Sequence, residues 1–470
     1  LMLCLCNHYQ VFYTVQLTQS HPSMFKKIGF ISVRCVFISS QVESAIFMLP
    51  ASLALLVFIS LGGWVISGSC VTLLALIFTR LYINIPQPAA PYVYVQAAFG
   101  KGMAFLTSWI YLLVYLISDT SIVIAAVVYL APLLGGLTPL ASLLLEIFVL
   151  LIITLINIRG VSVAASMGLV LAILKCLPLL IIPLRDMLVG KGVYFYPINP
   201  HQLNISAVLS QAILMDLWCF IGLKTVIATT GISNNPRRTA PIAIIVVTSF
   251  VVVLHLLNSV GMMTAVSGRL LVTSSAPYVE ATGSISGLSW DIATAFIVLI
   301  FCIATLNCGV MVGRQFGYAA AQAELFTKVF AITNQYDFPY VNIPLIFFLK
   351  VALLLMTLNQ ELINQLTTII NVTVINYLFI YILCLVAFIK LNKKTNKLYS
   401  WMALLLLLLF CWLVVTGSSK DIWLSLLPIL SGLPFYLWQT GKWKIWKSFR
   451  LVRQREIEHY NPFSYPYQLT

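Results

Sequence analysis

The sequence has 470 residues, of which 61% are hydrophobic and only 9% are charged, and its mean hydropathy is +0.99. Soluble domains carry about 25% charged residues, so this composition excludes a soluble multidomain enzyme, a disordered chain and a disulfide-framed secreted protein. The apolar runs are long enough for membrane-spanning helices and lack the strict alternation of membrane strands. The sequence therefore predicts an all-α polytopic membrane protein.

Twelve apolar segments can be counted, each near the roughly 20 residues that a helix needs to cross about 30 Å of hydrocarbon. We predict transmembrane helices over residues 28–54, 57–80, 102–131, 138–158, 162–184, 205–231, 240–264, 289–320, 342–358, 362–389, 399–417 and 421–440. Turn-forming sequences such as Pro86-Gln87-Pro88 and Gly135-Gly136 separate neighbouring segments.

The positions of the basic residues explain the net charge of +14. With the N-terminus inside, 18 Lys and Arg residues fall on the cytoplasmic side and only Arg185, Lys191, Arg269 and Lys420 on the other. Because cytoplasmic loops are enriched in Lys and Arg, we expect both termini in the cytoplasm and no nucleic-acid partner. Residues 1–23 contain no Lys or Arg, so they lack the basic region of a signal peptide. We expect a disordered extension over 1–23 and a basic cytoplasmic tail over 441–470.

The cysteines and histidines form no pattern typical of metal binding. The ten cysteines include no CxxC pair, and several lie in apolar runs, which favours small buried hydrophobic residues. These are Cys35, Cys70, Cys176, Cys302, Cys384 and Cys411. We predict no metal site and no cofactor, and since no Ser/His/Asp set or phosphate-binding loop is visible, no enzyme.

Ionisable residues inside predicted spans are candidates for function, because each costs about 2.5–3.5 kcal/mol at the centre of a membrane helix. They are Glu43, Asp119, Glu146, Asp216, Arg34, Lys175, Lys224, Arg314 and the neutral-capable His255. Two alternatives stay open. Arg34, Arg314, Glu146 and Asp216 could extend to water from near an interface, and His255 could be a packing residue with satisfied hydrogen bonds.

Two spans combine polar residues with positions that can interrupt a helix. The first contains the stretch 39–45 before Ile46-Phe47-Met48-Leu49-Pro50, and the sixth contains the stretch 218–225 around Gly222. Interrupted helices at membrane depth line cavities and mark transporter binding sites. The alternative is a kink with a purely structural role.

Ordered motifs along the chain resemble those of the amino acid–polyamine–organocation permeases, and most closely the bacterial basic amino-acid/polyamine antiporters of the arginine/agmatine exchanger type. They are Ile46-Phe47-Met48-Leu49-Pro50-Ala51, Pro86-Gln87-Pro88-Ala89-Ala90-Pro91-Tyr92-Val93-Tyr94, Trp218-Cys219-Phe220-Ile221-Gly222 and Asn235-Pro236-Arg237-Arg238-Thr239-Ala240-Pro241. The resemblance extends from about Phe25 to Lys444, which includes nearly all the predicted spans.

This resemblance implies a LeuT-like core of two inverted five-helix repeats, over 24–184 and 185–390, with broken helices 1 and 6 and two further helices over 391–440. It implies a substrate between the two breaks. The substrate-binding positions would be Gln41, Glu43, Ser44, Ala45, Asp119, Trp218, Phe220, Ile221, Gly222 and Lys224. Lys175 matches a lysine linked to proton coupling in related permeases, with a static structural role as the alternative. Gly309 falls where the family has a gating tryptophan.

The chain departs from the family pattern at several of these positions. Glu43 and Ala45 replace the glycines of the first break, and Lys224 stands where the antiporters have glutamate. The family's D-G-L-F-P reads Ala323-Glu324-Leu325-Phe326-Thr327. Glu43 and Lys224 could form an ion pair. Asp119 could bind a substrate ammonium group or pair with Lys224.

We expect a secondary transporter of amino acids or related amines in a bacterial inner membrane, working by antiport or proton symport. Its partners would be an amino acid or polyamine, protons and the lipid bilayer, and a homodimer is an open possibility for its assembly. The alternative is a transport-inactive relative that serves as a sensor or assembly partner, or has no function.

Overall fold

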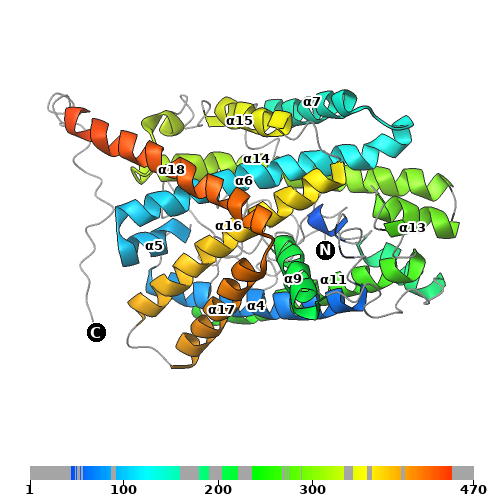
Figure 1. Cartoon of the computed structure of the whole chain (residues 1–470), viewed down its shortest axis with the longest axis horizontal. Helices are drawn as coiled ribbons and strands as arrows, with labels where there is room; N and C mark the ends of the chain where they lie inside the picture. Colours follow the sequence, from blue (N-terminus) through cyan, green and yellow to red (C-terminus); the bar gives the residue numbers. More distant parts are fainter. Residues whose placement is uncertain are drawn as a thin grey trace.

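The computed structural model of the chain describes residues 44–47, 49, 53, 57–85, 91–158, 179–189, 204–220, 236–266, 270–271, 274, 276–286, 288–332, 342–356, 362–392 and 397–446. Within these ranges every regular element is a helix (Figure 1). The predicted all-α architecture is confirmed for this part of the chain.

The helices follow one another with few long connections. Their bounds are η1 (Ser44–Phe47), α4 (Val57–Asn84), α5 (Pro91–Phe99), α6 (Lys101–Leu130), η2 (Ala131–Leu134), α7 (Pro139–Ile158), α9 (Ile205–Cys219), α11 (Pro236–Ala265), α13 (Pro277–Ser286), α14 (Leu288–Gln322), η5 (Lys328–Ala331), α15 (Asn342–Met356), α16 (Leu362–Leu391), α17 (Lys397–Thr416) and α18 (Ser419–Trp446).

Most predicted spans correspond to one helix each, with ends that agree within a few residues. Six described helical stretches are long and apolar enough to cross a membrane: Ile59–Asn84, Lys101–Leu130, Pro139–Asn157, Ile245–Ala265, Thr368–Leu391 and Lys397–Thr416. The first and fifth predicted spans lie mostly outside the described residues, so the count of twelve stays a prediction. The short helices α5 and α13 were not predicted, because each lies between two apolar segments.

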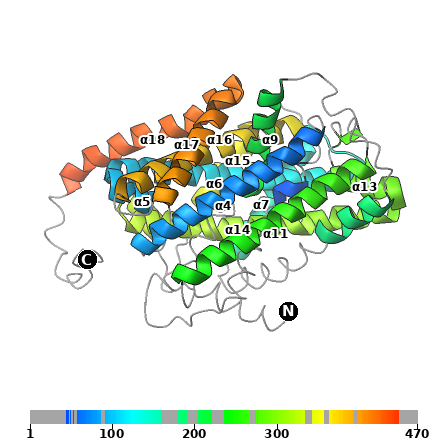
Figure 2. The same ribbon diagram turned by 90° about the horizontal axis from the view of Figure 1, so that it is seen from below.

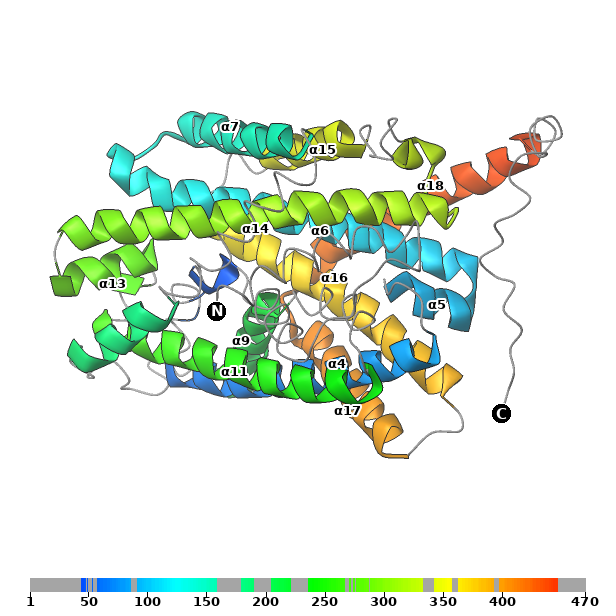
Figure 3. The ribbon, with the colours of Figure 1, turned by 180° about the vertical axis from the view of Figure 1, so that it is seen from behind.

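Helix α6 forms the centre of the bundle and is buried along most of its length. It runs beside α14 along the long axis of the molecule and also packs against α16, α5 and α18 (Figures 1 and 3). Helix α4 packs against α11 and α9, and Figure 2 shows α4 and α11 side by side. Two helices of the predicted first repeat, α4 and α6, therefore each contact helices of the predicted second.

The outer helices present apolar faces to the surroundings. On α7 the exposed large residues recur every three or four positions, which is one face of a helix. They are Leu140, Leu144, Phe148, Leu151 and Leu155, each between 39% and 60% exposed. An apolar face of this size is typical of contact with lipid rather than water. It supports the predicted membrane class.

The free cysteines divide between the interior and this outer surface. Cys70, Cys302 and Cys384 are buried, as predicted. The prediction is wrong for Cys411, which is exposed on the outer helix α17, where an apolar run faces outward rather than into the bundle. Cys35 and Cys176 lie outside the described residues.

Basic side chains at one end of the bundle contact neighbouring helices. Arg80 of α4 donates to the hydroxyl of Tyr399 in α17 at 3.0 Å, and Lys390 of α16 donates to a carbonyl of α5 at 2.7 Å. Lys101 at the start of α6 pairs with Glu324, just beyond the end of α14, at 3.4 Å. All three cations belong to segments whose charge predicts the cytoplasmic side.

Candidate functional site

The 3-10 helix η1, Ser44–Phe47, overlaps the stretch 39–45 in which the sequence predicts a break of the first span. A 3-10 turn has poorer hydrogen-bond geometry than an α-helix and is used in short pieces. Phe47 anchors it: the Phe47 carbonyl accepts a hydrogen bond from the hydroxyl of Tyr129 at 2.6 Å, and its ring packs edge-on against Tyr278 and Phe301. The backbone of Ser44 and Ala45 lies in η1, whereas Gln41 and Glu43 lie outside the described residues.

Helix α9 ends within the stretch 218–225 in which the sequence predicts a break of the sixth span. The helix begins after Asn204, whose side chain accepts a hydrogen bond from the amide of Ser206 at 3.0 Å. It ends at Cys219, and Phe220 forms a turn with φ −100° and ψ 8°. Trp218 and Phe220 are both buried, and α9 packs against η1. Ile221, Gly222 and Lys224 lie outside the described residues.

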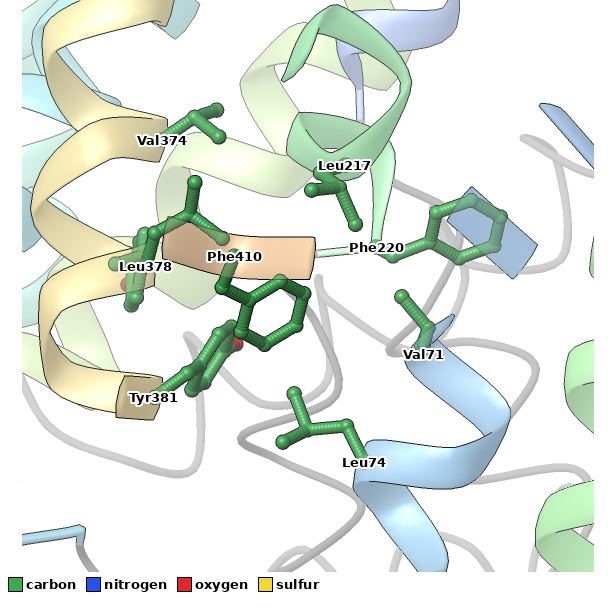
Figure 4. Close-up of a pocket in the computed structure, with 9 residues that line it drawn as sticks. Val71, Leu74, Leu217, Phe220, Val374, Leu378, Tyr381 and Phe410 are labelled. Carbon is green, nitrogen blue, oxygen red and sulfur yellow. The ribbon is translucent and has the colours of Figure 1, made fainter. Parts of the chain in front are cut away.

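A small apolar cavity lies beside this helix end, as Figure 4 shows. Leu217 and Phe220 contribute from α9, and α4, α16 and α17 supply the other walls. The remaining lining residues are Val71, Leu74, Val374, Tyr377, Leu378, Tyr381 and Phe410. Such a lining favours a hydrocarbon group over a charged one. Among the predicted substrate-binding residues that the structure describes, only Phe220 lines this cavity.

Asp119 in the middle of α6 forms a buried ion pair with Lys350 of α15. The Lys350 ammonium donates to Oδ2 of Asp119 at 2.5 Å, and the two side chains are 1% and 3% exposed. It also donates to the hydroxyl of Tyr115 at 3.4 Å and lies 4.9 Å from the centre of the Tyr115 ring. Lys224, one of the alternative partners considered for Asp119, lies outside the described residues, and the lysine that the structure places on Asp119 is Lys350.

Glycines on α14 make the room for this cluster. A Cβ atom built at Gly309 would overlap the Asp119 carboxylate, and one at Gly313 would overlap the Tyr115 ring. The Tyr115 hydroxyl donates to the carbonyl of Gly309. Missing side chains let helix backbones approach closely, and here the space is filled by the Asp119 carboxylate and the Tyr115 ring. Gly309, predicted as a gating position, is therefore a contact of Asp119.

A second buried carboxylate, Asp216 of α9, has a different environment. Its side chain is fully buried, so the alternative in which it extends to water is wrong. Neither carboxylate oxygen has a hydrogen-bond partner in the part of the chain that the structure describes. Oδ2 lies against α4, where a Cβ atom built at Gly63 would be 2.5 Å away.

His255 of α11 is a packing residue, as one alternative predicted. Its ring stacks on Trp64 of α4 with centres 4.7 Å apart and meets the edge of Phe220 at 5.4 Å. Hydrogen bonds to its ring nitrogens, which that alternative also expected, are not found among the described residues. Three helices thus meet through aromatic contacts next to the end of α9.

The described site residues form two groups. Asp119 and Gly309 are in contact through α6 and α14, and Trp218 and Phe220 lie at the end of α9. Lys175 lies outside the described residues. Sequence reasoning missed Lys350 and Tyr115. Lys350 could have been found, because a lysine inside the apolar run Phe347-Phe348-Leu349-Lys350-Val351 is as costly as the ionisable residues that were selected.

A bundle of apolar helices with lipid-type outer faces defines an integral, polytopic membrane protein. The family model described as "Amino acid permease" matches residues 28–428. The chain belongs to this family. The resemblance to amino acid–polyamine–organocation permeases is confirmed.

Curated relatives cover most of the chain. The putrescine transporter PotE of Escherichia coli (strain K12) is 26% identical over 382 residues, which is 79% of this chain and 85% of the relative. PotE of Haemophilus influenzae (strain ATCC 51907 / DSM 11121 / KW20 / Rd) is 26% identical over 79% of this chain and 86% of its own length. The cadaverine/lysine antiporter of E. coli (strain K12) is 27% identical over 67% of this chain and 72% of its own length.

Proposed function

We propose that the chain is a secondary active transporter that carries amino acids or related primary amines across a bacterial inner membrane by alternating access. Exchange of two substrates and proton-coupled symport are the two modes that the family resemblance allows. The observation that carries the proposal is the contact of η1 with α9, the two helices that overlap the stretches where the family resemblance implies helix breaks.

The chemistry of helix breaks suits a charged substrate group such as an amine. Free backbone groups at interrupted helices can bind charged groups of a substrate. The apolar cavity beside Phe220 has room for about one water-sized group in this conformation, so it does not hold a substrate chain. PotE and the cadaverine/lysine antiporter are named for amines and an amino acid, and these relatives make diamines and basic amino acids the first substrates to test.

We further propose a LeuT-like core of two inverted repeats with both termini in the cytoplasm. The distribution of basic residues supports this orientation, because Arg80, Lys101 and Lys390 belong to segments in which the excess of Lys and Arg predicts the cytoplasmic side. Lys175 is proposed as the proton-coupling residue. The Glu43–Lys224 ion pair and a homodimeric assembly stay hypotheses.

The test is counterflow in liposomes that contain the purified full chain. Vesicles loaded with one amine or amino acid receive the same labelled compound outside, with and without an inward proton gradient. We expect uptake of at least one compound above empty liposomes. Uptake without the gradient would indicate exchange, and uptake that requires it would indicate symport.

Variants separate the possible outcomes of this experiment. Lys175→Ala should abolish any dependence on the proton gradient, whereas the loop variant Lys191→Ala should not. Folded, inserted protein that moves no compound of the panel would contradict the proposal. The transport-inactive relative would then be the better explanation.

A further inference from the structure

The ion pair inside the bundle has the composition of a binding site for a primary ammonium group. Asp119 supplies a carboxylate at 2.5 Å from the Lys350 nitrogen, and Tyr115 supplies a hydroxyl oxygen at 3.4 Å. The Tyr115 ring lies 4.9 Å from the same nitrogen, within the range of a cation–π contact. A primary ammonium has three donors and no acceptor, and this cluster offers it acceptors and an aromatic ring.

The cluster is preorganised by groups other than Lys350. The Tyr115 hydroxyl is oriented by its hydrogen bond to the Gly309 carbonyl. The Asp119 carboxylate and the Tyr115 ring occupy the space that side chains at Gly309 and Gly313 would need. Both observations concern α6 and α14, so contacts with α14 help to place the acceptor groups in addition to their contacts with Lys350 of α15.

Lys350 reaches this site from a different helix than the acceptors do. Helix α15 packs against α6, α7 and α14, and Lys350 is eight residues from its first residue, Asn342. The Lys350 ammonium group therefore binds the Asp119 carboxylate in the position that the amine of a small molecule would take. An amine cannot bind there while Lys350 stays, because the site holds one cation and the pair is almost fully buried.

We infer that Asp119 and Tyr115, with the Gly309 carbonyl behind them, form an ammonium-binding site whose occupant in this conformation is the chain's own Lys350. The ligand class is primary alkylamines, including diamines and the side chain of basic amino acids. Lys350 acts as a tethered competitor that keeps Asp119 from these ligands. The biological meaning of this inference rests on the proposed function. An amine substrate would bind Asp119 only after the Lys350 side chain has moved away from the carboxylate.

The test is ligand-dependent thermal stability of the full chain in detergent, with methylamine, butylamine and 1,4-diaminobutane as probes. Lys350→Ala should lower Tm, and primary amines should raise it again with a saturable dose dependence. A ligand that binds only the folded state stabilises it in this way. We expect at least a tenfold lower apparent Kd for butylamine in Lys350→Ala than in the unchanged protein.

Matched controls make this result specific to Asp119. The double variant Asp119→Asn/Lys350→Ala has the same space as Lys350→Ala but lacks the carboxylate. Its Tm should therefore not rise when amines are added. Lys350→Arg keeps a cation at the site and should also stay insensitive. Butanol and sodium chloride at equal concentration control for solvent and ionic strength. If Lys350→Ala yields no folded protein, the milder Lys350→Gln takes its place in the same series.

Two results would overturn the inference: no amine response in a folded Lys350→Ala or Lys350→Gln protein, or an equal response in the double variant. The measurement needs no transport. Amine binding without any flux would leave the ammonium site standing and contradict the proposed function. Flux without amine-dependent stabilisation would support the proposed function and contradict the ammonium site.

Discussion

Asp119 of α6 and Asp216 of α9 are both carboxylates buried within helices of one membrane bundle, and their surroundings differ. Asp119 has an ammonium group at 2.5 Å and an aromatic ring beside that ammonium group. Asp216 has no hydrogen-bond partner among the described residues and lies against the backbone at Gly63. Both are nevertheless next to a glycine of a neighbouring helix, where an added Cβ would meet the carboxylate.

The comparison shows that a close-packed glycine can serve two arrangements. At Gly309 it admits a carboxylate that is held by a cation, and removal of that cation leaves a buried charge. At Gly63 the space is taken by the Asp216 carboxylate, which has no such partner among the described residues. Removal of the Asp216 charge therefore removes an unfavourable desolvation free energy and breaks no described ion pair. The two sites should therefore respond to mutation with opposite sign.

The largest expected effect comes from removal of the cation. Lys350→Met should lower the free energy of unfolding by about 3–5 kcal/mol, because it leaves Asp119 buried without its partner. Denaturant-induced unfolding in detergent micelles measures this change. The double variant Asp119→Asn/Lys350→Met should recover most of the loss, since no uncompensated charge remains. A single-variant loss below about 1 kcal/mol would show that the pair is not a significant contact.

The next effect concerns the glycines beside the two carboxylates. Gly309→Ala should cost about 1–3 kcal/mol, because the new methyl group displaces the Asp119 carboxylate from its place. In an Asp119→Ala/Lys350→Met background the same change should cost less than about 1 kcal/mol, which a double-mutant cycle detects.

Gly62 and Gly63 supply an internal control for the glycine experiment. At Gly62 the nearest atom to an added Cβ is 4.0 Å away, so Gly62→Ala should be neutral or stabilise α4 by up to about 1 kcal/mol. At Gly63 the Cβ would be 2.5 Å from Asp216, so Gly63→Ala should destabilise. Equal effects at these neighbouring positions would contradict the packing described here.

Much of this arrangement could be predicted from the sequence. Apolar run length predicts α6 and α14 to within a few residues, and a carboxylate inside an apolar run identifies Asp119 as a candidate. A break in the span 205–231 was predicted at the motif Trp218-Cys219-Phe220-Ile221-Gly222, and α9 ends within this motif. These features are local: each depends on residues that are close together in the chain.

The partner of Asp119 could not be predicted in this way. Lys350 is 231 residues further along the chain, and several other cations lie in apolar segments. Spacing along the sequence does not say which of them reaches a given carboxylate, because the choice depends on how α15 packs against α6. The buried environment of Asp216 is equally non-local, since it depends on the approach of α4.

A smaller change in stability is expected for substitution of Asp216. Asp216→Asn keeps the shape of the side chain and removes the charge, so we expect no loss of stability and a gain of up to about 1 kcal/mol. The same unfolding measurement applies, with Asp119→Asn as the matched change at the paired site. Asp119→Asn should instead be strongly destabilising, because it leaves Lys350 buried without its anion. Similar losses for both variants would mean that Asp216 also has a charged partner.

The smallest effect is expected where an ion pair lies at the surface. Glu324 pairs with Lys101 at 3.4 Å, but the two side chains are 44% and 67% exposed, so the pair contributes at most about 1 kcal/mol. Glu324 also has φ 59°, a left-handed conformation that costs a non-glycine residue about 1–2 kcal/mol. This is the position at which the family motif D-G-L-F-P has glycine.

Replacement of Glu324 by glycine therefore relieves the backbone strain and at the same time removes the exposed ion pair. Glu324→Gly should raise the free energy of unfolding by up to about 1 kcal/mol, because relief of the left-handed strain exceeds the loss of the pair. Lys101→Ala removes the pair and leaves the strain, so it should be neutral or slightly destabilising. If Glu324→Gly lost more stability than Lys101→Ala does, the surface pair would be stronger than its exposure allows. This result would contradict the expectation that the exposed pair contributes much less to stability than the buried pair.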